Sequence, residues 1–220
     1  RLAQGMGVRP EWLALLPPTL LALTGDFAFY SAVGLEEVLF TALVTWSLAW
    51  VYARPADEVL KSNGYPLLNA LVILTRPEGA LICALLFLMM LRRDTLLKVM
   101  LCGLKLVLFL LPVLVWKYSY YGYWLPNTWY VKGNAGFANV EHGAVYFLFN
   151  IRRYLGVFVL LLGLTVYGRY MHRPPTGKTI APVLFILLIW FAHLIVQGGD
   201  NMVGGRFFLP VLPMLYCALI

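Results

Sequence analysis

Charged residues are scarce in this sequence. They make up 12% of its 220 residues, whereas hydrophobic residues make up 61%. A soluble domain typically contains about 25% charged and about 45–50% apolar residues. A soluble protein of this size has too little interior to bury so much apolar surface. The composition therefore excludes an ordinary soluble fold and predicts a protein whose solvent is lipid.

Paired cysteines and internal repeats are also missing. The three cysteines, Cys83, Cys102 and Cys217, lie within apolar runs, and none has a second cysteine at ligand spacing. This pattern predicts small apolar packing residues and no disulfide or metal framework. The absence of an internal repeat argues against a transporter built from inverted repeats.

The formal charge of +7 does not indicate a nucleic-acid partner. The basic residues form short clusters between long apolar runs, as expected for the cytoplasmic loops of a membrane protein. The apolar runs are rich in leucine and are interrupted by proline and glycine, which transmembrane helices tolerate. The sequence therefore predicts an all-α, multi-pass transmembrane helix bundle.

A helix needs roughly 20 apolar residues to cross a bilayer. Apolar runs occupy residues 12–30 (with a kink expected at Pro17–Pro18), 35–52, 67–91, 99–116, 154–167, 180–197 and 207–220. Residues 117–153 are predicted to form a long outer loop, and the run 207–220 to be a truncated last helix. Since the chain starts at Arg1 without an initiator methionine, we expect residues 1–220 to be part of a single membrane domain in a longer protein.

The run 67–91 carries charges near its middle, at Arg76 and Glu78. As a single span it would place both charges at mid-bilayer, at a few kcal/mol each, and Pro77 would remove a helix hydrogen bond. We therefore predict a hairpin of two short helices, with Arg76–Gly79 at its tip. The hairpin also places the basic clusters on one side, the cytoplasm, and the unusual polar clusters on the outer side.

Four polar clusters then share the outer face. Glu36 begins the second span, where a carboxylate is stabilised by the helix dipole or can face a cation or a sugar hydroxyl. Glu37 lies about 100° further around the helix, so we do not expect the two to act as a pair. Arg76 and Glu78 could form an internal salt bridge, or Arg76 could bind a phosphate, which its forked donors suit.

The remaining two clusters follow later in the chain. Asp200 and Arg206 flank a glycine-rich turn at 198–206, and glycines allow backbone N–H groups to approach an anion. His193 shares a helical face with Asp200, although a buried interhelical hydrogen bond would also explain it. The aromatic segment 118–132 contains Tyr121, Asn127 and Lys132; it could form an interfacial aromatic belt or stack on sugar rings.

These clusters carry a resemblance to a known family. The segments Gly34-Leu35-Glu36, Thr75-Arg76-Pro77-Glu78-Gly79, Tyr121-Gly122 with Leu125-Pro126-Asn127-Thr128, and Gly199-Asp200-Asn201-Met202 before Arg206-Phe207 occur in this order. Over residues 12–213 the chain resembles the GT-C integral-membrane glycosyltransferases, in particular the subgroup of the mycobacterial terminal arabinofuranosyltransferase and related bacterial proteins.

The resemblance implies a function in the cytoplasmic (inner) membrane, with an extracytoplasmic active face. Such enzymes move a sugar from a polyprenyl-phosphate donor to a glycan, lipid or protein acceptor. By the resemblance, Glu36 and Asp200 are candidate catalytic residues. The family's acidic pair in the first outer loop, which supplies the expected catalytic aspartate, would lie upstream of Arg1. Glu37 departs from the family pattern, which has a small polar residue there.

The candidate residues are expected to have different chemical roles. Arg76, Arg206 and Lys132 would bind the donor phosphate, whereas Glu36, Glu78 and Asp200 would orient sugar hydroxyls or hold a divalent cation. Asn127, Tyr121 and His193 are further candidates for substrate binding. The alternative is a transporter of lipid-linked sugar without enzymatic activity, which would place ionisable groups near the bilayer midplane.

Overall fold

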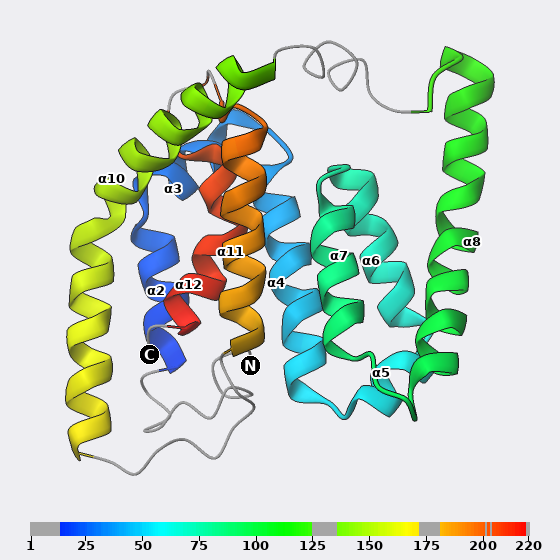
Figure 1. Ribbon diagram of the computed structural model, residues 1–220, viewed down its shortest axis with the longest axis horizontal. Coiled ribbons are helices and arrows are strands. Elements are labelled where there is room, and N and C mark those ends of the chain that lie inside the picture. Colours follow the sequence, from blue (N-terminus) through cyan, green and yellow to red (C-terminus); the bar gives the residue numbers. More distant parts are fainter. Residues whose placement is uncertain (1–13, 125–135, 172–180, 201, 203, 219–220) are drawn as a thin grey trace.

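In a computed structural model, the chain is described over residues 14–124, 136–171, 181–200, 202 and 204–218. These residues form helices and contain no strand. The prediction of an all-α fold is therefore confirmed. Most of the helices run nearly parallel or antiparallel to one another (Figure 1), so the molecule has two distinct ends.

The first two helices are short. Helix α2 spans Leu16–Leu23, and α3 spans Gly25–Val33. Two prolines begin α2, where their missing N–H groups cost nothing, and the break falls at Thr24, whose backbone is extended. The kink expected at Pro17–Pro18 was therefore wrong. Gly34, in the left-handed conformation that glycine favours, ends α3.

Helix α4 (Glu37–Ala53) lies in the middle of the bundle and contacts α3, α5, α6, α7, α12 and the 3-10 helix η2. Phe40, Val44 and Leu48 are fully buried, as expected for residues four apart on one helix face. The axes of α3 and α4 differ by 117°. Because of this bend, α4 begins close to the segments that carry the other polar clusters.

The hairpin predicted in the run 67–91 is confirmed. Helix α6 spans Gly64–Thr75 and α7 spans Gly79–Met89. Arg76 has an extended backbone, as residues that precede proline usually do, so α6 ends there. Helices of 12 and 11 residues are each too short to cross a hydrocarbon layer of about 30 Å.

The remaining elements close the bundle. Helix α5 (Ala56–Lys61) connects α4 to α6, and α8 (Leu96–Tyr121) packs beside α5 and α6. Helix α10 (Gly136–Met171) packs against α11 (Ala181–Val196), and η2 (Arg206–Val211) continues into α12 (Leu212–Ala218). Since α8 ends at Tyr121 and α10 begins at Gly136, much of the predicted outer loop 117–153 is helical.

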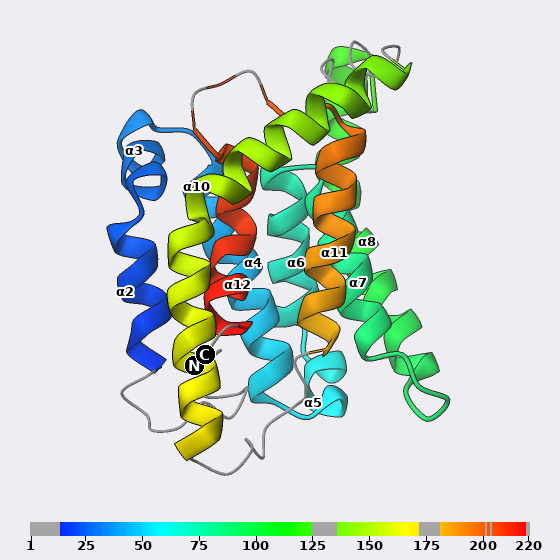
Figure 2. The same ribbon diagram turned by 60° about the vertical axis from the view of Figure 1, so that its left-hand side comes forward.

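Helix α10 changes direction part-way along its length, and its first half lies obliquely across one end of the bundle (Figures 1 and 2). A Cβ atom at Gly143 would lie 2.0 Å from the carbonyl oxygen of Ile195 on α11. The two helices therefore approach each other closely at this point, which only a glycine permits.

Among the described residues, α8 is long and apolar enough to cross a membrane, and the bent pair α3–α4 would count as a second crossing if it is one span. Most of the α8 surface is exposed, including these large apolar side chains: Leu97, Met100, Leu101, Leu104, Val107, Leu108, Leu111 and Val115.

Candidate functional site: an ion-pair cluster at one end of the bundle

Four segments that are distant in the sequence meet at the end of the bundle that α10 crosses (Figure 2). They are the start of α4, the turn between α6 and α7, the segment after α11, and the start of η2. Each contributes charged side chains, namely Glu36, Glu37, Arg76, Glu78, Asp200 and Arg206, which we call the ion-pair cluster. Five of these six residues were predicted site residues, and the structure brings them together.

Arg76 lies at the centre of the cluster, and its side chain is 9% exposed. Its Nη1 atom is 2.6 Å from Glu37 Oε1 and 3.5 Å from Glu36 Oε1, and its Nη2 atom is 3.6 Å from Glu78 Oε1. Three carboxylates thus surround one guanidinium. The internal salt bridge that the sequence left open is present, whereas a phosphate-binding role for Arg76 stays a prediction.

Arg206 is the second cation of the cluster. Its Nε atom is 2.7 Å from Asp200 Oδ2 and 3.3 Å from Glu37 Oε1, and its Nη2 atom donates to Asp200 Oδ1 at 2.9 Å. The Phe207 ring lies under both guanidinium groups, at 4.9 Å from Arg76 and 5.0 Å from Arg206. Such contacts stabilise a cation by roughly 0.5–2 kcal/mol. The aromatic ring therefore helps to fix both arginines.

Glu37 joins the two arginines and is fully buried. Both Glu36 and Glu37 lie near Arg76, but Glu37 is buried and 43% of the Glu36 side chain is exposed, so the expectation that the two do not act as a pair stays a prediction. Oε2 of Glu37 has no hydrogen-bond partner among the described residues. The sequence did hold a signal for this residue, since Glu37 lies three and seven positions before Phe40 and Val44, on the face that the helix buries.

The cluster carries more negative than positive charge, with four carboxylates against two guanidinium groups. Exposure varies widely among the carboxylates: 43% of the Glu36 side chain is exposed, 18% of Glu78, 5% of Asp200 and none of Glu37. The carboxylates of Glu36 and Glu78 are therefore the more accessible ones, whereas those of Glu37 and Asp200 are largely buried beneath them. Carboxylate oxygens that face outward can accept hydrogen bonds from sugar hydroxyls.

The remaining predicted site residues do not all join the cluster. His193, in the last turn of α11, packs on Trp190 and lies within electrostatic range of Glu78; its Nε2 atom has no hydrogen-bond partner in the described part of the chain. Tyr121 ends α8 and contacts Trp116 and Tyr120. Asn127 and Lys132 lie outside the described residues.

A second charged group lies beside the cluster. The sequence placed Asp26 on the same face but did not predict its partner. Asp26 on α3 is buried, and its Oδ1 atom is 2.9 Å from Arg153 Nη2 on α10. Its Oδ2 atom accepts hydrogen bonds from the Tyr154 hydroxyl and from the Gly205 N–H group. No local sequence pattern could have found a pair that is separated by more than a hundred residues.

The opposite end of the bundle is basic and exposed. Lys98 Nζ lies 2.8 Å from Asp57 Oδ1, and this hydrogen bond holds the pKa of the Asp57 carboxyl below its usual value. Lys105 donates to the side chain of Asn63. The two ends of the bundle therefore differ in character, since the charges of one form a largely buried cluster and those of the other face outward.

Within the described residues, no group of three or more histidine, cysteine, aspartate or glutamate side chains could hold a metal ion. We therefore assign no metal ligands. No family model, curated protein or solved structure matches the chain.

Proposed function

We propose that this chain is the membrane part of a GT-C-type glycosyltransferase, which moves a sugar from a polyprenyl-phosphate donor to an extracytoplasmic acceptor. The observation that carries the proposal is the convergence of Glu36, Arg76, Glu78, Asp200 and Arg206 at one end of the bundle. These residues come from the separate segments on which the family resemblance rests. Ionisable residues in the apolar segments of a membrane protein are costly and usually mark a functional site.

A multi-pass membrane topology is part of the proposal. The exposed apolar side chains of α8 support it, because an apolar surface of this extent is costly in water. The hairpin α6–α7 would enter the membrane from the cytoplasmic side and return to it, with its tip at Arg76 and Glu78 turned toward the outer face. The ion-pair cluster would then face the outside and the basic end the cytoplasm.

An apolar cavity offers room for the lipid tail of the donor. It has a volume of about 420 Å³ and lies between α2, α3, α4 and α12, with a lining that includes Pro17, Leu21, Phe27, Trp46, Pro213 and Cys217. The Thr41 and Thr45 hydroxyls in its wall donate to backbone carbonyls one turn earlier, at Glu37 and Thr41. A predominantly apolar wall suits an isoprenoid chain. Because Thr41 follows Glu37 by one helical turn, the cavity adjoins the ion-pair cluster.

The carboxylates divide naturally by exposure. We assign Glu36 and Glu78 to the orientation of substrate hydroxyls, and Asp200 to catalysis. Arg76 and Arg206 would hold Glu37 and Asp200 in place, because their guanidinium groups are occupied by carboxylates. Lys132, Asn127, Tyr121 and His193 stay candidate substrate-binding residues.

The test uses the complete protein in detergent with a panel of radiolabelled polyprenyl-phosphate sugars. Wild type would be compared with Glu36→Gln and Asp200→Asn, with Asp94→Asn as the matched control, because Asp94 is exposed at the opposite end. We expect one donor to be turned over by wild type and the control, and turnover to fall by at least about tenfold in both site variants.

Two results would contradict the proposal. Full activity in both site variants would remove the ion-pair cluster from the reaction. Equal binding of labelled lipid by all four proteins, without turnover of any donor, would favour the transporter of lipid-linked sugar instead.

A further inference from the structure

The arginines at the polar end of the bundle differ in how many carboxylates they contact. Arg76 contacts three and Arg206 contacts two, whereas Arg153 contacts only Asp26 among the described residues. Exposure follows the same order, at 9% and 16% for the first two side chains and 45% for Arg153. An incoming anion would meet the carboxylates around Arg76 and Arg206, but it can reach Arg153 directly.

A buried carboxylate fixes the direction of Arg153. Asp26 Oδ1 lies 2.9 Å from one terminal nitrogen, Nη2, of the guanidinium. The other oxygen of Asp26 accepts hydrogen bonds from Tyr154 and Gly205, so the carboxylate itself cannot swing away. A guanidinium has five N–H donors in a rigid fork. Those that Asp26 does not engage stay available on the exposed side of Arg153.

Arg153 is also close to the ion-pair cluster. Asp26 binds the backbone of Gly205, the residue before Arg206, and a Cβ atom at Gly204 would lie 3.0 Å from Asp26 Oδ1. The carboxylate that holds Arg153 therefore packs directly on the turn that positions Arg206. A ligand bound by Arg153 would sit beside the carboxylates that we assign to the sugar.

We propose that Arg153 binds the phosphate group of the lipid-linked donor. This inference rests on the proposed function and supplies the cation that the neutralised Arg76 and Arg206 do not offer. Guanidinium pairs with phosphate through two parallel N–H···O bonds. Asp26 acts as a positioning residue, because it holds the guanidinium in one orientation before the donor arrives.

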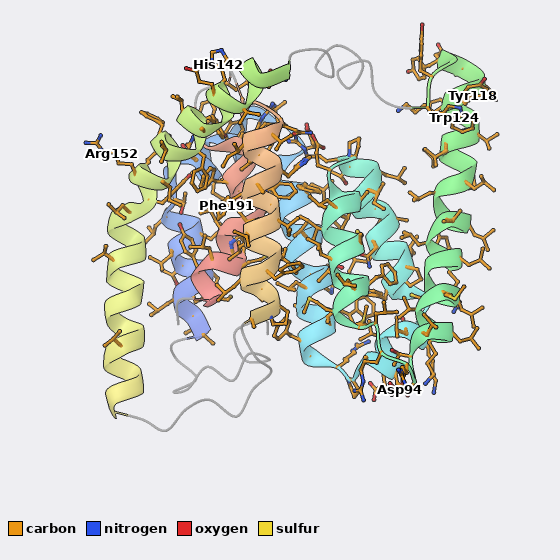
Figure 3. The ribbon with its side chains drawn as sticks, viewed as in Figure 1. Asp94, Tyr118, Trp124, His142, Arg152 and Phe191 are labelled. Atoms are coloured by element: carbon orange, nitrogen blue, oxygen red, sulfur yellow. The ribbon has the colours of Figure 1, made fainter. Side chains whose placement is uncertain are left out.

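Arg152 provides a matched control. It is the preceding residue on α10, is exposed, and carries the same charge. Neighbouring residues on a helix point about 100° apart, and Figure 3 shows Arg152 directed away from the bundle. A general attraction to anionic membrane surfaces would involve both arginines, whereas a defined phosphate site would involve Arg153 alone.

The experiment measures binding of a labelled polyprenyl phosphate without sugar to the complete protein in nanodiscs of zwitterionic lipid. Wild type, Arg153→Gln, Arg153→Lys and Arg152→Gln would be compared. We expect Arg153→Gln to raise the Kd by about tenfold or more, the scale of a charged hydrogen bond. Arg153→Lys keeps the charge but loses the forked donors, so its affinity should lie between those of wild type and Arg153→Gln. Arg152→Gln should match wild type.

The outcomes separate this inference from its alternatives. Unchanged affinity in Arg153→Gln, or an equal loss in both glutamine variants, would overturn it. Competition by phosphatidylglycerol as effective as that by unlabelled polyprenyl phosphate would overturn it too, since the site would then bind any anionic headgroup. Binding that depends on Arg153, in a protein that turns over no donor, would uphold the phosphate site and reject the glycosyltransferase. Gel filtration would confirm that each variant is folded.

Discussion

Two neighbouring carboxylates at the start of α4 lie in very different surroundings. Glu36 is 43% exposed and lies 3.5 Å from Arg76, whereas Glu37 is fully buried and contacts both Arg76 and Arg206. An exposed ion pair contributes little to stability, because water screens it. Removing one partner of a buried pair is costly, since the remaining charge is left in a medium that solvates it poorly.

We therefore predict that the same Glu→Gln substitution lowers the free energy of unfolding much more at position 37 than at position 36. Glu37→Gln should lower the free energy of unfolding by about 3 kcal/mol, the lower end for a broken buried pair, because Arg76 keeps Glu36 and Glu78. Glu36→Gln should change it by less than about 1 kcal/mol. Titration with SDS, followed by circular dichroism, measures both values. Equal losses in the two variants would show that the burial of Glu37 does not govern its contribution.

The candidate site could be predicted in part at the level of residues. Glu36, Asp200 and Arg206 stood out as charges at the ends of apolar runs, and Arg76 and Glu78 as charges inside one. Their placement at one end of the bundle followed from the predicted topology. Glu37 could have been found from its helix face, which it shares with Phe40. The pairing of Asp26 with Arg153 could not, because only the three-dimensional fold brings these distant residues together.

At the scale of elements, the close approach of α10 to α11 depends on one residue without a side chain. Gly143 lies against the backbone of Ile195, and a Cβ atom there would overlap its carbonyl oxygen at 2.0 Å. Gly156, later on the same helix, has nothing within 4 Å of its Cβ position. The two glycines therefore differ in packing but not in secondary structure.

Gly143→Ala should destabilise the protein by about 1–3 kcal/mol, because the helices must move apart to admit the methyl group. Gly156→Ala should be neutral, or should stabilise by up to about 1 kcal/mol, because alanine favours helix more than glycine does. Thermal unfolding of both variants in the same detergent provides the comparison. A stable Gly143→Ala protein would mean that α10 is not seated on α11 as described.

The prediction of elements succeeded where the cause was local. The hairpin was predicted from Arg76 and Pro77 inside an apolar run, and helix α6 does end just before Arg76. The kink was predicted at Pro17–Pro18, but the structure places the break at Thr24. Prolines in a first helical turn begin a helix instead of kinking it. Both neighbouring helices extend into the predicted loop, since α8 ends at Tyr121 and α10 begins at Gly136. Aromatic and polar residues do not by themselves exclude a helix.

The whole molecule has two different ends, and this difference predicts how it lies in a membrane. Asp94 lies at one end and His142 at the other (Figure 3). Because basic residues surround Asp94, the positive-inside rule leads us to expect that end in the cytoplasm. The native cysteines Cys83, Cys102 and Cys217 are buried, so an introduced cysteine would react against a low background.

His142→Cys should be labelled in intact cells by a membrane-impermeant maleimide, whereas Asp94→Cys should be labelled only after the cells are permeabilised. The comparison reports the orientation directly, because both positions are exposed. The reverse pattern would place the ion-pair cluster in the cytoplasm and would remove the extracytoplasmic acceptor from the proposed reaction.

The packing of α2 on α12 has a consequence for how the protein is made. The Thr24 hydroxyl lies 3.1 Å from the Tyr216 hydroxyl, across a sequence separation of 192 residues. At about 5–20 residues per second, a ribosome needs on the order of 10–40 s to synthesise the chain between them. During this interval the first described helices lack their final neighbour. The ion-pair cluster, which also needs Arg206, is completed only at the end of that interval.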